Sequence, residues 1–516
     1  MIYKALYFFS ALACAFCAML TPVLREGSDS SPRIINFVTA LLLFVILHHI
    51  VDKVALWIKK RQCRHQIRLS QKALFCILFL VFFLIGIGNL LVYYPGTGMY
   101  DTLAILKTSV TDMAKQHPWF YCLIVRGIVK VAFTLHGGYE LALVICSLLQ
   151  ITVTSGVYAY VLVWLRNKNV RPLAWYLAVA FYMILPIWGL YMVTLLKDVP
   201  FSLLLTAWVP VLYDYWETKG KSLQSPKAYA AVVLLILLAL LRNNGIYVTA
   251  FILLTMLFVN VIHWKRVLSL FLVLFLVILG SNAFEKHNNI THLFKETVGI
   301  PLQQIAAVVT YGGEISDEQL EFVDAVLDTE FIKENYNPYT ADKLKWGGAP
   351  LDNGFLNSHK TEFLKVWFGI FRNNVGTYLK AHLQNTYGFW SLNNRHKSVY
   401  YTTLYVASYD EWLQENEIDI KNILPEAQQQ RIEKLKINLY KVPGSGTLFW
   451  TFVFFMLVLV KHTDWKILSV ASPVVGCWIT LMISTPVAIQ WRYLLCAPMA
   501  LPIIIALLFR CKPSKS

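Results

Sequence analysis

The dominant pattern in this chain is a series of apolar runs separated by short polar segments. Runs of about 17–25 apolar residues are long enough to cross a lipid bilayer as a helix. Residues 73–92 and 139–165 are two such runs, and a lysine or an arginine borders each of them. The pattern predicts an all-α integral membrane protein with about twelve transmembrane helices, at residues 3–23, 34–52, 73–93, 139–164, 172–192, 199–216, 228–241, 246–262, 267–283, 447–460, 467–484 and 493–509.

The composition supports this prediction. The chain has 516 residues, of which 57% are hydrophobic and 15% are charged, whereas soluble domains have about 25% charged residues. So few charges could not cover the surface of a soluble protein of this size. The first apolar run has no clear small-residue cleavage site, so we expect it to be a retained span and not a signal peptide.

One long stretch, residues 284–446, lacks apolar runs of this length. Ser316 followed by Gln319 predicts a capped helix start, and Phe363, Trp367 and Ile370 have helical spacing in a second helix at about 360–384. We therefore expect three parts: a transmembrane region at 1–283 with outer loops at 94–138, 193–198 and 242–245, a mostly helical extracytoplasmic domain at 284–446, and a C-terminal hairpin, final helix and basic tail at 447–516.

Basic residues set the expected orientation. They gather in the loops after the second, fourth, sixth, eighth and last predicted spans, which places these loops and both termini in the cytoplasm. Residues 284–445 then lie outside, and they hold 16 Lys and Arg against 20 Asp and Glu. The net charge of +16 is therefore an orientation signal, and nucleic acid is not expected as a partner. This topology requires residues 119–135, with Arg126 and Lys130 one turn apart, to lie along the membrane as an interfacial helix.

Asp101 is the first candidate for chemistry. It follows the turn that begins Tyr94-Pro95-Gly96, just outside a predicted span, and acidic residues are rare outside the 284–446 stretch. A carboxylate held at the membrane surface can accept a proton from an attacking hydroxyl. The alternative is that Asp101 caps the helix that follows it. Tyr94 in the same turn and Glu140, near the next predicted outer helix end, are weaker candidates for binding a substrate.

Three further candidates lie in the first two outer loops. His117 precedes Pro118, where it could bind a substrate or simply sit in a solvated helix-start turn. Lys197 and Asp198 are adjacent and directly follow a span, so they could bind a lipid phosphate and orient a second group. Alternatively, both residues have purely structural roles: the lysine extends its charged end to the membrane surface, and the aspartate caps a helix.

Two arginines contradict the orientation rule, since both are expected on the outside. Arg242 starts the sequence Arg242-Asn243-Asn244-Gly245, and Arg492 lies between the last two spans. A tight turn explains the asparagines and the glycine but not the arginine. Guanidinium groups make bidentate contacts with phosphate, so Arg242, Asn243 and Arg492 are candidates for substrate binding.

The order of these motifs resembles the GT-C class of membrane glycosyltransferases: Tyr94-Pro95-Gly96 and Asp101, then His117-Pro118, then Lys197-Asp198 in the next outer loop. The chain is also similar to an uncharacterised family of Gram-positive bacterial membrane proteins, in residues 242–245, 300–306 and 378–390. The resemblance implies a GT-C-like fold in the bacterial plasma membrane, with interfacial helices in the first large outer loop. It departs from the class in having a single Asp101 where Asp-x-Asp or Glu-x-Asp is usual.

The resemblance also implies roles. The donor would be a sugar on polyprenyl phosphate, and the acceptor a cell-wall polymer, a glycolipid or a glycoprotein outside the membrane. Asp101 would be the general base, Asp198 would orient the substrate, and Lys197, Arg242 and Arg492 would stabilise the departing phosphate. A divalent cation, Mg²⁺ or Mn²⁺, is the one cofactor that the resemblance admits. If this is right, Asp101 and Asp198 lie close together, in one site beneath the 284–446 domain that opens sideways to lipid.

Two other functions fit the same sequence. A transporter or a flippase for lipid-linked glycans would be expected to carry charges in the middle of spans and paired half-helices. An outer-leaflet glycan polymerase or ligase has the same many spans, large outer loop and arginines as a glycosyltransferase. Sequence alone does not separate these alternatives.

Overall fold

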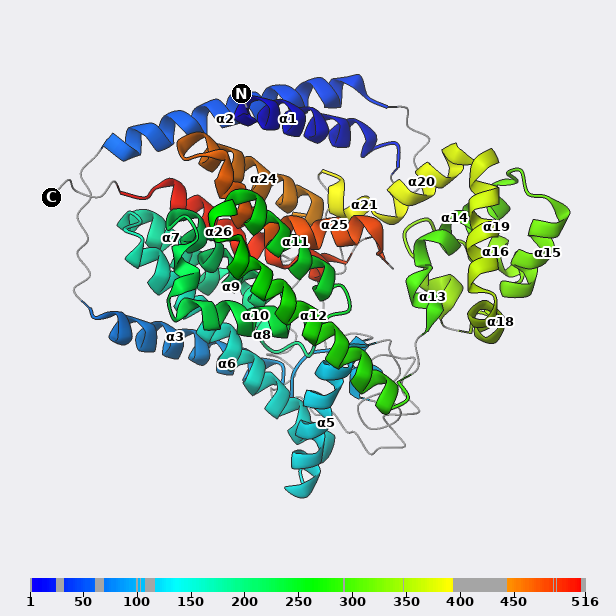
Figure 1. The fold of residues 1–516 in the computed structure, drawn as a ribbon, viewed down its shortest axis with the longest axis horizontal. Helices are drawn as coiled ribbons and strands as arrows, with labels where there is room; N and C mark the ends of the chain where they lie inside the picture. Colours follow the sequence, from blue (N-terminus) through cyan, green and yellow to red (C-terminus); the bar gives the residue numbers. More distant parts are fainter. Residues whose placement is uncertain are drawn as a thin grey trace.

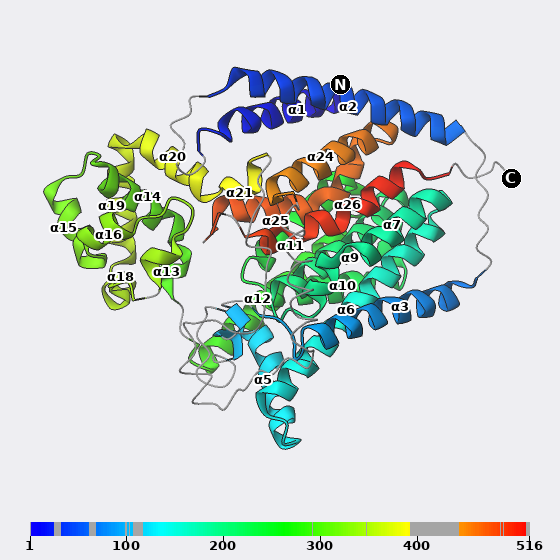
Figure 2. The same ribbon diagram turned by 180° about the vertical axis from the view of Figure 1, so that it is seen from behind.

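We describe the protein from a computed structural model, shown from two opposite sides in Figures 1 and 2. The described residues are 2–24, 32–60, 69–98, 101–102, 104–106, 117–290, 293–346, 348–392, 443–485, 487–488 and 490–511. Among them the secondary structure is helical, and the only β contacts are three isolated bridges.

The apolar runs form one helical bundle with a continuous buried core. Its helices are α1 (Ile2–Leu20), α2 (Ile34–Lys60), α3 (Gln71–Val92), α5 (Trp119–Thr134), α6 (Gly138–Asn167), α7 (Pro172–Ile184), α8 (Pro186–Met192), α9 (Asp198–Glu217), α10 (Lys227–Leu241), α11 (Gly245–Val259), α12 (Trp264–His287), α24 (Ser445–His462), α25 (Ser472–Ile483) and α26 (Cys496–Leu508), with the 3₁₀ turns η1 (Lys221–Gln224), η2 (Val261–His263), η5 (Trp465–Ala471) and η6 (Trp491–Leu494).

Eight helices in the described part of the chain are long and apolar enough to cross a membrane: α1, α2, α3, α6, α12, α24, Trp465–Ile483 and Trp491–Leu508. The protein is therefore an α-helical membrane protein with several spans. Each of the twelve predicted ranges falls on helix, but α7, α10 and α11 are shorter, and α9 carries Asp198, Asp214 and Glu217.

The range predicted as one span at 172–192 is two helices. Pro186 begins α8 and has no N–H to donate, and the residue before it, Leu185, is extended with φ −72° and ψ 113°. The prediction of one continuous helix there was wrong because the proline ends α7 inside an apolar run.

The second body is a small helical domain with its own core, centred on Leu302, Ile305, Val323, Phe363 and Ile370. Its helices are α13 (Phe294–Thr297), α14 (Gly299–Tyr311), α15 (Asp317–Val326), α16 (Thr329–Asn335), α17 (Asp342–Lys345), α18 (Asn353–Ser358), α19 (Lys360–Asn373) and α20 (Val375–Asn385). The short helix α21 (Tyr387–Trp390) follows α20 and packs against α24 and α25 of the bundle, whose core includes Phe389. The rest of the predicted domain, residues 393–442, lies outside the described residues.

Two local predictions for this domain can be compared with the structure. The capping box at the start of α15 is confirmed, because the Ser316 side chain accepts from the Gln319 N–H and the Gln319 side chain accepts from the Ser316 N–H. The single helix expected at 360–384 is two helices, α19 and α20. Asn374 separates them, and its side chain donates to the carbonyls of Glu314 and Ile370.

The small domain lies at one end of the bundle, and both views show the end of α2 and the C-terminus at the opposite end (Figures 1 and 2). The two bodies are joined through a short bridge between Thr340 and Val487 and a hydrogen bond from the Ala488 N–H to the Tyr339 carbonyl at 2.8 Å. The domain therefore meets the bundle at the loop between α25 and α26.

The first two helices pack against α24. Asp52 of α2 forms an ion pair with Lys461 at 2.8 Å, its Oδ1 lies 3.0 Å from the His462 Nε2, and Phe44 packs edge-on against Phe454. At the other end of the hairpin, the Tyr387 hydroxyl donates to the Thr21 carbonyl at 3.0 Å. The N-terminal hairpin thus spans the side of the bundle and reaches the junction with the small domain.

Candidate functional site

Backbone contacts between two distant loops place Asp101 beside Lys197 and Asp198. The Thr97 N–H donates to the Val193 carbonyl at 2.8 Å, and the Leu195 N–H donates back to the Thr97 carbonyl at 3.2 Å. The Thr102 hydroxyl donates to the Leu195 carbonyl at 2.9 Å. The loop after α3 and the loop before α9 are therefore one structural unit.

Gly96 and Gln150 make this contact possible. Gly96 has φ +143°, and a Cβ at this position would lie 2.7 Å from the Ser147 Oγ and 3.1 Å from the Val193 carbonyl oxygen. A side chain would therefore push the two loops apart. The Gln150 amide, buried in α6, donates to the carbonyls of Tyr191 and Thr194 at 2.6 and 2.7 Å and fixes the second loop.

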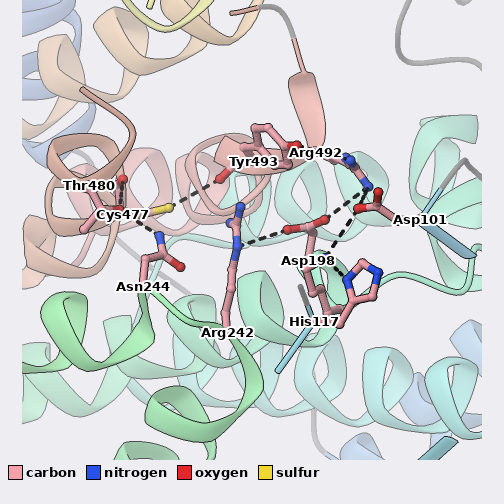
Figure 3. Close-up of polar contacts among 10 residues, drawn as sticks. Asp101, His117, Asp198, Arg242, Asn244, Cys477, Thr480, Arg492 and Tyr493 are labelled. Carbon is pink, nitrogen blue, oxygen red and sulfur yellow. Dashed lines mark hydrogen bonds and ion pairs between the residues drawn. The ribbon is translucent and has the colours of Figure 1, made fainter. Parts of the chain in front are cut away.

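Arg492 joins the two carboxylates of the site (Figure 3). Its Nη1 lies 2.8 Å from the Asp101 Oδ2 and 3.5 Å from the Asp198 Oδ2. The two oxygens are thus no further apart than the sum of these distances, and the expectation that Asp101 and Asp198 lie close together is confirmed. Arg492 is held by its neighbours: the Trp491 ring stacks on Tyr191, and the Trp491 indole donates to the Pro443 carbonyl at 3.1 Å.

Arg242 approaches Asp198 from the other side. Its Nε lies 3.2 Å from the Asp198 Oδ1, and its guanidinium carbon lies over the rings of Phe201 and Tyr493 at 5.5 and 5.0 Å. Asp198 is fully buried and begins α9, where the helix dipole favours a negative charge. The Arg242 Nη1 is buried and has no hydrogen-bond partner among the described residues.

The turn after Arg242 is fixed by two residues. The Asn244 amide donates to the Thr480 hydroxyl at 2.8 Å, which ties the turn to α25. A Cβ on Gly245 would lie 1.9 Å from the Leu238 carbonyl oxygen, so only glycine fits there. Asn243, predicted to bind substrate, is exposed in this turn, and no contact joins it to the charged residues in the described part of the chain.

His117 joins the cluster through Lys197. The Lys197 Nζ lies 2.9 Å from the His117 Nδ1 and 3.4 Å from the Asp101 Oδ2. Burial and the neighbouring Lys197 charge lower the pKa of His117 to about 3, so the imidazole is neutral at physiological pH. An ammonium donates to Nδ1, which leaves the proton on Nε2, and this buried nitrogen has no hydrogen-bond partner among the described residues.

The ion pairs of Asp101 change its chemistry. Burial alone would raise the pKa of this carboxyl group, but the nearby charges of Arg492 and Lys197 and the neighbouring His117 outweigh burial and hold the pKa of Asp101 well below its usual range. A carboxylate in this state is ionised at every relevant pH, but it is a weak proton acceptor.

Two predicted residues form a separate pair. The Tyr94 hydroxyl donates to the Glu140 carboxylate, and this hydrogen bond, with partial burial, raises the pKa of Tyr94 to about 12. No contact joins either side chain to Asp101 or Arg492 in the described residues. The structure therefore brings together Asp101, His117, Lys197, Asp198, Arg242 and Arg492, and leaves Tyr94, Glu140 and Asn243 apart.

Two residues of the site were not predicted. The Tyr493 hydroxyl accepts a hydrogen bond from the Arg492 Nη2 at 3.2 Å, and the Tyr493 ring lies under the guanidinium groups of Arg242 and Arg492. Its position next to Arg492 was the only signal in the sequence. Asp342 of α17 is near enough for the charges of Asp101 and Arg492 to act on it, and nothing in the sequence distinguishes it from the other acidic residues of its domain.

The site does not have the donor set of a metal centre. The described residues contain no group of three or more His, Cys, Asp or Glu side chains placed to hold a metal ion. Asp101 and Asp198 are both bound by cationic side chains, and the cluster has three cations, Lys197, Arg242 and Arg492, against two carboxylates. The carboxylate oxygens of Asp101 and Asp198 are thus taken up by Lys197, Arg242 and Arg492, an arrangement that suits an anionic ligand on the cations better than Mg²⁺ or Mn²⁺ on the carboxylates.

A cavity of about 410 Å³ lies elsewhere, at the opposite end of the bundle. Trp164 and Asp214 line it, and Lys168 binds Asp214 at 2.6 Å beside it. None of the predicted site residues lines this cavity.

The chain belongs to a protein family of unknown function, DUF6020, whose members it matches over residues 105–516. The matched range includes Asp198, Arg242, Asp342 and Arg492 and begins four positions after Asp101. No curated protein and no solved structure matches the chain.

Proposed function

We propose that the protein is a glycosyltransferase of the GT-C type, which moves a sugar from a polyprenyl-phosphate donor to a hydroxyl of an acceptor outside the membrane. The observation that carries the proposal is the buried cluster at the domain end of the bundle, where three cationic side chains surround two carboxylates. An anionic ligand that reaches this end of the bundle from the bilayer is a lipid phosphate.

In this proposal Lys197, Arg242 and Arg492 receive the phosphate. The acceptor oxygen attacks the anomeric carbon, the bond between that carbon and the phosphate oxygen breaks, and the electron pair stays on the phosphate. Cationic donors stabilise the charge that develops there, which is commonly worth about 3–4 kcal/mol per group. The Arg242 Nη1 and the His117 Nε2, which have no hydrogen-bond partners among the described residues, are the donors best placed to bind a ligand.

Asp101 and Asp198 hold these cations in place. Without them, three positive charges would repel one another in a buried site. The base role predicted for Asp101 suits it less well than this positioning role, because its ion pairs make it a weak base.

The proposal includes an orientation. The small domain lies outside the plasma membrane of a bacterium, both termini lie in the cytoplasm, and the chain crosses the membrane twelve times, with α7 and α8 together as one crossing. The helix α5 lies along the membrane surface; Figure 1 shows it steeply inclined to α1, α2 and α3. A transporter is less well supported, because the charges of the cluster lie at helix ends and not halfway along spans.

A transfer assay tests the proposal. The purified protein in lipid nanodiscs is given polyprenyl phosphates carrying different sugars, and the release of free polyprenyl phosphate is measured. We expect release with at least one donor, and a loss of about 100-fold or more in Arg492→Gln. Movement of intact donor between leaflets without release would favour a flippase, and growth of a glycan chain on the lipid would favour a polymerase.

A further inference from the structure

The segment 339–345 of the small domain lies against the loop that leads to Arg492. Thr340 bridges Val487, and the Tyr339 carbonyl accepts the Ala488 N–H at 2.8 Å. Val487 and Ala488 precede Arg492 by only a few residues. The short helix α17 begins immediately after this bridge, and its first residue is Asp342, on which the charges of Asp101 and Arg492 act.

Asp342 lies near the cluster without being tied to it. The charges of Asp101 and Arg492 act on Asp342, and the charge of Asp342 acts in turn on Tyr493. Within the domain the Asp342 Oδ1 lies 3.7 Å from the Lys345 Nζ. The Asp342 side chain is 44% exposed, compared with 24% for Asp101 and 0% for Asp198. Of the three carboxylates, it is therefore the one that a substrate can reach most easily.

The surroundings of Asp342 and Asp101 have opposite effects. Partial burial raises the pKa of Asp342. The negative charges of Glu296 and Asp101 add to this rise, and the positive charges of Lys345 and Arg492 oppose it. The pKa of Asp101 is lowered by its ion pairs. Asp342, with a raised pKa, is therefore suited to accept a proton, whereas Asp101, with a lowered pKa, is suited to stay ionised.

We propose that Asp342 is the general base of the transfer reaction and takes the proton of the acceptor hydroxyl on the domain side of the site. The inference depends on the proposed function. As the acceptor oxygen bonds to the anomeric carbon, its proton passes to the Asp342 carboxylate, and the electron pair of the broken bond leaves on the lipid phosphate. The acceptor is therefore a hydroxyl compound that enters between the small domain and the bundle, opposite the donor.

The pH dependence of transfer by the full-length protein tests this role. Asp342→Asn should lower kcat by about 100-fold or more and change the donor KM by no more than about threefold, since a general base contributes about 10²–10⁴-fold to the rate. Asp352→Asn is the matched control. Asp352 also starts a short helix of this domain and accepts from the Phe355 N–H at 2.9 Å, but it caps α18 and should leave transfer unchanged.

A second readout separates a base from a structural residue. Transfer should fall on acidification as the base becomes protonated. Asp101→Asn, which removes a negative charge that raises the pKa of Asp342, should move this acidic limb to lower pH in the activity that remains. Asp342→Glu should keep part of the activity and also move the limb. If Asp342→Asn does not fold, the Asp342→Glu variant decides. An acidic limb in its pH profile identical to that of the wild type would overturn the proposal.

The outcomes distinguish the two proposals. If the wild type releases no polyprenyl phosphate with any donor, the proposed function fails. If the wild type is active and Asp342→Asn keeps more than about a third of its kcat, the base assignment is wrong and the proposed function stands. Little loss in Asp342→Asn, together with loss of the acidic limb in Asp101→Asn, would return the base role to Asp101.

Discussion

The Arg492 Nη1 lies 2.8 Å from the Asp101 Oδ2, although 391 positions of sequence separate the two residues. The contact joins the loop after α3 to the turn before α26, and the same nitrogen also reaches Asp198. The cluster therefore depends on the correct packing of the first and the last parts of the bundle.

Removal of Arg492 should destabilise the protein. Arg492→Gln leaves Asp198, which is 0% exposed, with fewer cations, and breaking a buried ion pair commonly costs about 3–5 kcal/mol. Adding Asp101→Asn should cost less than the sum of the two single changes, because the residues interact. Thermal unfolding in one detergent measures both. Lys333→Gln, which removes an exposed pair with Glu330, is the control and should change little. Equal stability of Arg492→Gln and Lys333→Gln would contradict the prediction.

Gly245 should be irreplaceable. Gly245→Ala places a Cβ where the Leu238 carbonyl oxygen would be 1.9 Å away, so the backbone must shift and Arg242, three residues earlier, must move with it. We expect a loss of about 1–3 kcal/mol in stability together with a loss of transfer. Gly280→Ala in α12, where a Cβ meets nothing within 4 Å, is the matched control. If Gly245→Ala behaves like Gly280→Ala, the turn is not as tight as described.

His117 should make stability fall on acidification. An unfolded histidine has a pKa of about 6.5, whereas the pKa of His117 in the folded protein is about 3. Between these values the unfolded chain binds one more proton, so the contribution of His117 is complete above pH 6.5 and is lost as the pH falls toward 3, by at most about 1.4 kcal/mol per pH unit. His117→Asn should flatten this part of the curve of unfolding temperature against pH. Parallel curves for the two proteins would show that His117 is not buried in its neutral form.

The orientation can be tested by cysteine labelling. Lys60 at the end of α2 and Glu318 in α15 are both exposed, and they lie in the parts expected in the cytoplasm and outside. Single Lys60→Cys and Glu318→Cys variants are treated in intact cells with a maleimide that does not cross membranes. We expect Glu318→Cys to react in intact cells and Lys60→Cys only after permeabilisation. Labelling of both in intact cells would exclude this topology.

The helices could be predicted because the signal for each is local. Apolar runs and basic borders are visible in any short window, and the Ser316 and Gln319 capping box lies within four residues. The breaks at Pro186 and Asn374 were missed because a periodic pattern continues through both positions. In each case a single residue with different backbone bonding ended the helix.

The site was predictable only where charge is rare. Asp101 and Asp198 were noticeable because acidic residues are rare outside residues 284–446, and Lys197, Arg242 and Arg492 because basic residues are unusual on the expected outer side. The same reasoning selected Glu140, which instead pairs with Tyr94. Asp342 could not be found this way, because it belongs to a domain with many acidic residues, and only the tertiary bridge from Thr340 to Val487 brings it to the cluster.

The central claim is that Lys197, Arg242 and Arg492 bind a lipid phosphate. An experimental structure of the protein in nanodiscs with bound polyprenyl phosphate tests this claim most directly. We predict that the phosphate lies within hydrogen-bonding distance of the Arg242 Nη1 and the Arg492 guanidinium, with the lipid tail leaving sideways between bundle helices. Lipid phosphate bound at the opposite end of the bundle, with the ion pairs of Asp101 and Asp198 unchanged, would contradict it.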